Sequence, residues 1–203
     1  MYYPDLSYYR VGNLSSESVA VFPEYRNIGW LWKNEPFREG KVSNSLICKL
    51  KEMLFLDIKN IEDKRNGMFE ESRAIWIHQE YLRGTPHKCQ FCGKEEIRLS
   101  PDGLSCYTGK STKLLGGNQI SIPSVEKGEF YVFPTLLYHY IVEHNYQPPQ
   151  ESLEAVEAFD LGKSYDSNKE QADEICIKVP GNLVNTLHLQ PIPKGLYPSC
   201  EDD

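Results

Sequence analysis

The chain has 203 residues, 40% of them hydrophobic and 25% charged, and carries a formal net charge of −7 at pH 7. This composition is ordinary for a soluble globular protein, and no apolar run approaches the ~20 residues that a membrane-spanning helix needs. The lysines and arginines are scattered and do not form the basic patch typical of nucleic-acid binders. Because residues 1–5 lack the basic and apolar regions of a signal peptide, we expect a cytoplasmic protein that binds neither membrane nor nucleic acid.

Two apolar runs lie near the N-terminus. Residues 19–22 form a strand candidate that ends before Pro23, and residues 28–32 form a second run that contains Trp30 and Trp32. Large rings in such runs usually fill a core. The alternative is that the two tryptophans line a binding groove, but we expect them in the core.

The clearest helix is predicted over residues 43–56. Ser43 or Ser45 can cap its N-terminus, and apolar side chains recur on one face at positions 46, 47, 50, 53 and 54. Residues 57–72 are polar and charged, and we expect a loop there. Residues 74–78 fit a strand and a helix equally well, and His78 is expected to be a structural histidine.

The middle of the chain predicts short strands separated by turns. A strand is predicted at 96–99 and a flexible, glycine-rich loop at 108–117. Residues 119–122 alternate polar and apolar side chains, which is typical of a half-buried strand. A turn then leads to a returning strand at 130–133.

Two short helices are predicted after that hairpin. Thr135 can cap the first helix, which carries apolar residues at helical spacing as far as His144. Asn145 and the following Pro148-Pro149 end it. The second helix covers residues 150–159. Beyond Asp160 the pattern weakens, with one more strand candidate at 175–179.

These elements predict an α+β fold with a small antiparallel sheet or hairpins and a few short helices. We expect a single domain over residues 1–160, with a zinc module at about 84–149, and a C-terminal extension over 161–203.

The chemistry-bearing residues gather between 84 and 149, which hold three of the five histidines and the one close cysteine pair. Cys-x2-Cys is a common way for one turn to present two thiolates to zinc, and a His-x4-His pair lies within the spacing of zinc sites. The sequence therefore predicts one Zn²⁺ site. Its four proposed ligands are Cys89, Cys92, His139 and His144.

Other ligand sets remain open. His87 lies two residues before Cys89, so an alternative set is His87, both cysteines and one of the helix histidines. Cys106 is also near enough in sequence to compete. Cys48 is expected to be a small buried hydrophobe. A redox role for the cysteine pair would need a helix after it, and the residues from Gly93 onward do not predict one.

The spacing of the two histidines raises a geometric objection. Residues five apart on a regular helix point about 140° from each other. His144, however, is expected where the helix ends, so that it can turn away from the regular direction and join His139 at one ion.

A cysteine turn, a hairpin and a helix with the last two ligands follow one another in the order of a treble-clef-like zinc module, here with an insertion at about 100–117. A catalytic zinc keeps an open position and needs a base nearby. Glu143 is the candidate base for that alternative, a zinc-dependent hydrolase. The His-Glu-x-x-His helix is absent from the sequence, and four side-chain ligands favour a structural ion.

The same stretches carry a resemblance. It rests on Gly29-Trp30-Leu31, Arg83-Gly84, His87-x-Cys89-x-x-Cys92-Gly93, Pro134-x-Leu136-Leu137-x-His139-Tyr140-Ile141 and His144-x-Tyr146-x-Pro148-Pro149. This order of motifs resembles a family of uncharacterised small bacterial proteins over roughly residues 1 to 160. The resemblance supports the architecture and implies no activity.

No catalytic constellation stands out elsewhere in the sequence. We therefore expect a non-enzymatic protein-interaction protein built on a structural zinc module, an immunity or accessory protein of a bacterial toxin or stress system. Its partner would be another protein.

Overall fold

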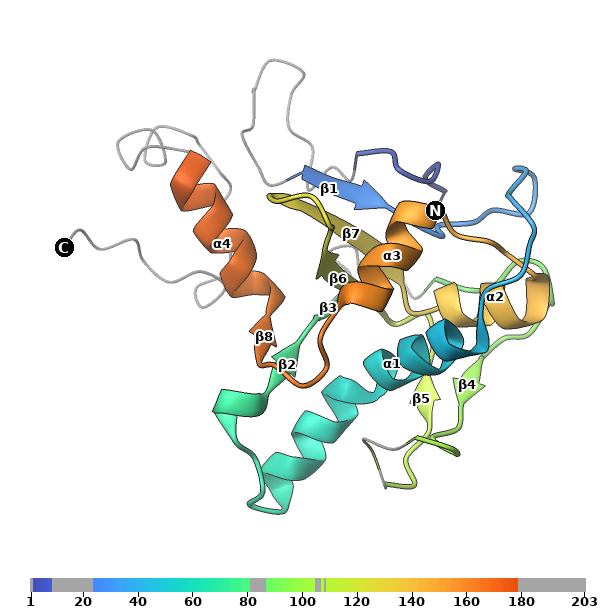
Figure 1. Ribbon diagram of the computed structural model, residues 1–203. Helices are drawn as coiled ribbons and strands as arrows, with labels where there is room; N and C mark the ends of the chain where they lie inside the picture. Colours follow the sequence, from blue (N-terminus) through green and yellow to red (C-terminus); the bar gives the residue numbers. More distant parts are fainter. Residues whose placement is uncertain (1, 9–23, 81–86, 105–106, 108, 179–203) are drawn as a thin grey trace.

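The computed structural model describes residues 2–8, 24–80, 87–104, 107 and 109–178 (Figure 1). The strand predicted at 19–22 and the rival ligand Cys106 lie outside these residues. Within them the fold is α+β, as the sequence predicts, but the small sheets include parallel pairs and are not purely antiparallel as expected. In the described part of the chain no helix combines the length and the apolar character needed to cross a bilayer.

A four-stranded sheet forms the centre, in the order β1-β7-β6-β3. The predicted hairpin is β6 (Asn118–Pro123) paired antiparallel with β7 (Glu129–Pro134). The outer strands are β1 (Glu24–Asn27), which runs parallel to β7, and β3 (His78–Glu80), which runs antiparallel to β6. Ile120 and Ile122 of β6 are completely buried, and Gln119 and Ser121 on the other face are 2% and 0% exposed, so the strand predicted to be half-buried is covered on both faces.

Two smaller strand pairs extend this arrangement. The spacing of apolar residues at 74–78 was compatible with a strand or a helix. The structure has strand β2 (Ile75–Trp76) there, which pairs in parallel with β8 (Tyr165–Asp166). The second pair is β4 (Arg98–Leu99) with β5 (Lys113–Leu114), in antiparallel register.

Helix α1 (Asn44–Arg65) begins where predicted, with the Ser43 hydroxyl oxygen accepting a hydrogen bond from the backbone N–H of Leu46. It continues nine residues beyond the predicted end, so the loop expected from residue 57 was wrong as far as Arg65. The polar residues of this second half suit a helix. Tertiary bonds hold it: the buried Asn60 amide donates to the Ile75 carbonyl over 2.9 Å.

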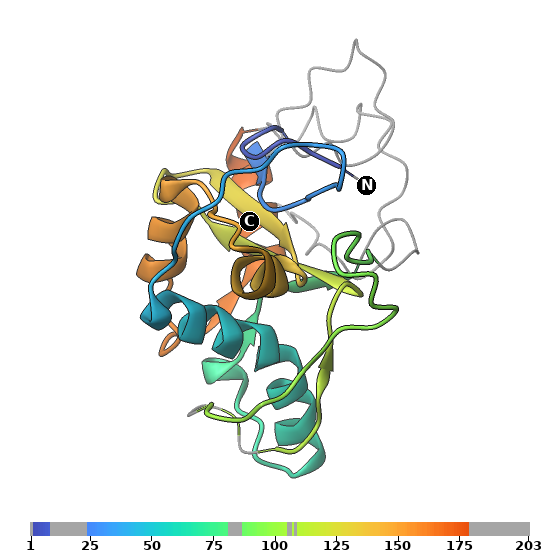
Figure 2. The same cartoon turned by 90° about the vertical axis from the view of Figure 1, so that its right-hand side faces the viewer.

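Two short helices follow the hairpin, α2 (Leu137–His144) and α3 (Gln150–Ala158), both close to their predicted bounds. Both helices pack against α1. Helix α2 lies on the right-hand side of the molecule in Figure 1, and Figure 2 shows that side from the front.

Helix α4 (Ser167–Lys178) contradicts the strand predicted at 175–179, because the described part of that stretch is helical. Gln171 ties the helix to the sheet, since its amide donates to the Ser121 hydroxyl over 2.7 Å and its carbonyl accepts from the Tyr25 hydroxyl over 2.9 Å. Helix α4 therefore contacts the four-stranded sheet through Gln171, while β8 before it pairs with β2. The division of the chain at residue 160 stays a prediction.

The core lies between the sheet and helices α1, α2 and α3. Its largest fully buried side chains are Trp30, Tyr140, Tyr146, Phe55 and Phe133. Trp30 is a core residue as expected, and its indole N–H donates to the Val132 carbonyl over 3.2 Å. Trp32 is half-buried.

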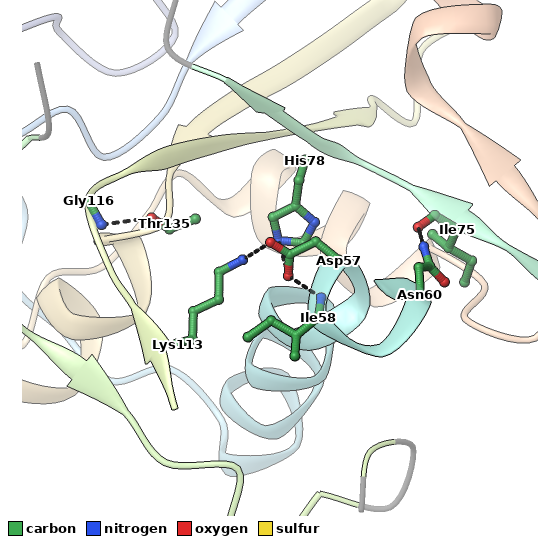
Figure 3. A network of polar contacts seen from close by, with 8 residues as sticks. All are labelled: Asp57, Ile58, Asn60, Ile75, His78, Lys113, Gly116 and Thr135. Carbon is green, nitrogen blue, oxygen red and sulfur yellow. Dashed lines mark hydrogen bonds and ion pairs between the residues drawn. The ribbon is translucent and has the colours of Figure 1, made fainter. Parts of the chain in front are cut away.

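A buried polar network joins α1 to two strands (Figure 3). The Lys113 ammonium of β5 forms an ion pair with Asp57 of α1, and the Lys113 side chain is 5% exposed. The His78 ring of β3 lies beside them, its Nε2 atom 3.8 Å from the Asp57 carboxylate. Burial, together with the neighbouring Lys113 charge, lowers the pKa of His78 to about 4 against the opposing effect of Asp57. His78 is thus a neutral structural histidine at pH 7.

This buried histidine predicts an acid-sensitive stability. In the unfolded chain His78 has an ordinary pKa near 6.5. Between about pH 6.5 and pH 4 the unfolded state therefore binds a proton at His78 that the folded state does not bind. The free energy of unfolding should fall across that window as the pH falls, by about 3 kcal/mol for this group at most. We expect His78→Gln to show a smaller loss between pH 7 and pH 4.5 in urea titrations. Equal losses in the two proteins would contradict this account, since any acid effect on the histidines elsewhere is common to both.

Candidate metal centre

The first half of the centre is the turn at residues 89–92. The backbone N–H of Phe91 donates to the Cys89 sulfur over 3.4 Å, which is the local bond expected when two cysteines flank a tight turn. Gly93 follows with φ +64°. Glycine adopts this left-handed conformation at little cost, so the chain can turn away directly after the second cysteine.

The second half is helix α2, which carries His139 and His144. Asn145 ends this helix, as predicted, and does so in the left-handed conformation with φ +53°. The N-terminus differs from the prediction. Leu136 occupies the cap position without a side-chain bond, and the Thr135 hydroxyl instead accepts the backbone N–H of Gly116 over 2.8 Å.

The two halves converge. The Cys89 sulfur lies 3.3 Å from Nε2 of His144, the Cys92 sulfur lies 3.6 Å from Nε2 of His139, and the two Nε2 atoms are 3.2 Å apart. All four ligand atoms lie within 4.8 Å of one another. A tetrahedron with Zn–S of about 2.3 Å and Zn–N of about 2.0–2.1 Å has N···N edges of about 3.3 Å and N···S edges of about 3.6 Å. The three N···N and N···S separations given above are close to these edges.

The helical spacing of the histidines does not prevent this meeting. Residues five apart point about 140° from each other on a regular helix. His144 is the last residue of α2, and the chain leaves the helix at Asn145. Because no helical turn follows His144, its ring is not held in the direction of a mid-helix side chain. The ring turns toward His139, and the two ring centroids are 4.9 Å apart.

The centre is buried on one side. Cys89 and His139 are 5% and 4% exposed, while Cys92 and His144 are half-buried. The turn and the helix thus each contribute one buried and one half-buried ligand. Phe91 closes part of the outer side, with its ring 5.2 Å from the His144 ring and 5.4 Å from Phe37.

Burial sets the protonation of these groups without a metal. It raises the pKa of the Cys89 thiol, and it lowers the pKa of His139 to about 4 and that of His144 below its usual range. Neutral imidazole is the form that binds a metal ion, so both rings are ready to coordinate at pH 7. The thiols must lose their protons, which a divalent cation brings about by its own charge.

His87, the rival ligand, is not part of this group. Its Nε2 atom lies 3.1 Å from the Tyr140 hydroxyl, and its backbone N–H donates to the Gly116 carbonyl over 2.7 Å. Its ring packs edge-on against Trp30 at 5.8 Å, and burial lowers its pKa to about 4. The alternative ligand set with His87 is therefore not assembled among the described residues. His87 instead joins the start of the cysteine segment to α2.

The structure also shows where Cys48 and the candidate base Glu143 lie. Cys48, predicted to be a buried hydrophobe, is exposed, because it lies on the solvent side of α1 away from the apolar stripe. Glu143, the base of the hydrolase alternative, is exposed on α2 next to His144.

The contacts that bring the two halves together were not predicted from the sequence. Gly116, expected in a flexible loop, holds the backbone of His87 and the side chain of Thr135. An added Cβ on Gly116 would lie 2.0 Å from the His87 carbonyl oxygen. The adjacent Gly116-Gly117 pair was the signal for this close approach of two backbones.

A family model for a domain of unknown function, DUF7919, matches residues 1–157. The match covers all four of the converging residues. Searches of the curated proteins and of the solved structures found no match to this chain.

The close approach at Gly116 can be tested against a matched glycine. Gly116 and Gly103 both have positive φ, +90° and +80°, but a Cβ on Gly103 meets nothing within 4 Å. Gly103→Ala should cost about 1–2 kcal/mol in the free energy of unfolding, the cost of the left-handed conformation. Gly116→Ala should cost about 1–3 kcal/mol more, because it also overlaps the His87 backbone. Equal losses in urea titrations would show that the approach of the two segments is not tight.

Proposed function

The chain belongs to the family of this domain of unknown function, DUF7919, and from its side chains we propose that it is a zinc-binding protein in which Zn²⁺ fastens the turn at residues 89–92 to helix α2. One observation carries the proposal. Two sulfurs and two imidazole nitrogens from distant parts of the chain meet at separations that suit a tetrahedral ion.

The donor set favours zinc among the common metals. Thiolate and imidazole ligands in a tetrahedral arrangement are typical of Zn²⁺, whereas Ca²⁺ and Mg²⁺ prefer oxygen ligands. Two thiolates also balance the charge of a divalent cation, so that the occupied centre is neutral and its burial costs little.

We further propose that the ion is structural and that the module is treble-clef-like. Four side chains fill the tetrahedron, whereas a hydrolytic zinc would keep one position for water. The order of a cysteine turn, the strand pairs β4–β5 and β6–β7, and a ligand-bearing helix supports the name. The ion would supply cross-links, while His87 and Phe91 position the cysteine turn against Tyr140 of α2.

The first prediction is a stoichiometry. The purified protein should hold one zinc ion per chain by elemental analysis, and Cys89→Ser or His144→Ala should reduce that content strongly, because three ligands bind more weakly than four. His87→Gln should leave the content unchanged, since Gln retains a hydrogen-bond acceptor for Tyr140 and His87 is not a ligand here. Co²⁺ exchanged into the site should give the intense visible absorption of a tetrahedral sulfur-containing centre. A zinc content that falls with His87→Gln and survives His144→Ala would overturn this ligand assignment.

The biological role that we propose is interaction with another protein, as an immunity or accessory protein, with zinc stabilising the surface that the partner recognises. The zinc-loaded wild type should retain a specific partner in affinity capture, and His144→Ala should lose it while keeping the far-ultraviolet circular dichroism of the large core. Recovery of no specific partner, or hydrolytic activity that depends on Glu143, would count against an interaction role and would leave the zinc proposal intact.

A further inference from the structure

The two cysteines of the metal centre differ in how much of each residue is exposed to solvent. Cys92 is half-buried and Cys89 is 5% exposed. Their partners differ in the same way, since His144 is half-buried and His139 is 4% exposed. Of the two cysteines, Cys92 is therefore the residue more open to a small solute.

The two sulfurs are also close enough to react with each other. They lie within 4.8 Å in one turn, whereas a disulfide has an S–S bond of about 2.05 Å. Because only two residues separate the cysteines, side-chain rotations and small changes within the turn can bring the sulfurs together. No movement of a helix or strand is required.

The turn has other attachments besides its ligand atoms. Just before it, His87 is bonded to Gly116 through the backbone and to Tyr140 through its ring. Within it, the Phe91 ring packs at 5.4 Å on Phe37 and at 5.8 Å on Tyr140. These contacts do not involve the sulfurs, so the turn can stay beside α2 when the cysteines change chemically. Such a change can then be reversed.

We propose that Cys92 is a peroxide-reactive site and that hydrogen peroxide converts the pair into a Cys89–Cys92 disulfide with loss of the metal ion. This inference rests on the proposed zinc site. The centre would then respond to oxidants as well as stabilise the fold.

The chemistry balances with hydrogen peroxide as the oxidant. The Cys92 thiolate attacks one peroxide oxygen, an S–O bond forms, the O–O bond breaks, and the leaving hydroxide takes a proton to become water. The Cys89 thiolate then attacks the sulfur of the Cys92 sulfenic acid, the S–S bond forms, and the S–O bond breaks with loss of a second hydroxide, which is also protonated. Two thiolates lose two electrons to one peroxide. A disulfide no longer offers thiolate ligands, so only His139 and His144 remain for the ion.

The test uses the zinc-loaded full-length chain. Hydrogen peroxide is added in steps, released zinc is measured with a colorimetric chelator, and disulfides are identified by peptide mass spectrometry. We expect one zinc released for each Cys89–Cys92 disulfide, and recovery of bound zinc after reduction and addition of Zn²⁺. Exposed Cys48 is the internal control. Oxidation of Cys48 while zinc stays bound, or conversion of the pair to sulfinic acids without a disulfide, would overturn the proposal.

The order of attack is tested separately with dimedone, which traps sulfenic acids. In Cys89→Ser, the remaining Cys92 should be labelled several-fold faster than the remaining Cys89 is in Cys92→Ser. The same order should appear in the wild type at limiting peroxide, as a transient adduct on Cys92, which covers the case of a variant that does not fold. Equal or reversed rates would remove Cys92 as the first site.

The outcomes separate the two proposals. If the protein neither contains nor takes up zinc, the zinc centre is wrong. If zinc is bound through the four named residues and survives excess peroxide with both thiols intact, only the oxidation proposal fails.

Discussion

The approach of the cysteine turn to helix α2 is the constraint on which the candidate metal centre depends. Residues 93–138 separate the two halves along the chain, and ordering and closing such a loop costs conformational entropy. The polypeptide offsets part of that cost itself. The backbone bond from His87 to Gly116, the His87–Tyr140 contact and the Phe91 ring already dock the turn on the helix. A metal ion would complete a contact that the chain already makes.

Residues 113–116 form one of the connections between this centre and the rest of the fold. Lys113 at the start of the segment forms an ion pair with Asp57 of helix α1, while Gly116 meets the His87 backbone and the Thr135 hydroxyl just before α2 (Figure 3). Both attachments are buried and polar, and a buried polar group that loses its partner costs about 1–3 kcal/mol. The segment therefore helps to set the position of the cysteine turn relative to α1 and α2. These attachments explain why its first two residues form strand β5, although its composition suggests a flexible loop.

The parts of the structure that the sequence predicted are those governed by local chemistry. The β6–β7 hairpin, the left-handed Asn145 cap and the cysteine turn depend on neighbouring residues, and their patterns were readable. The second half of α1 and helix α4 were misread, because their polar residues are held by Asn60 and Gln171, whose partners lie elsewhere in the chain. Likewise Thr135 was expected to cap α2, but its hydroxyl accepts a hydrogen bond from the backbone N–H of Gly116. The convergence of the four ligand residues could be proposed from spacing, whereas the exclusion of His87 needed the position of Tyr140.

The electrostatics of the centre bear on what an ion would do there. Burial raises the pKa of the Cys89 thiol and lowers the pKa values of both histidines, so it favours the uncharged forms of these three groups. A divalent cation with two thiolates and two neutral imidazoles is also uncharged overall, and so meets the same demand. Replacing one ligand with a bound hydroxide would preserve the charge only by displacing a sulfur, which the tight cysteine turn opposes. With four side-chain ligands around an ion, the half-buried edge at Cys92 and His144 would offer small reactants the ligands themselves rather than an open position on the ion.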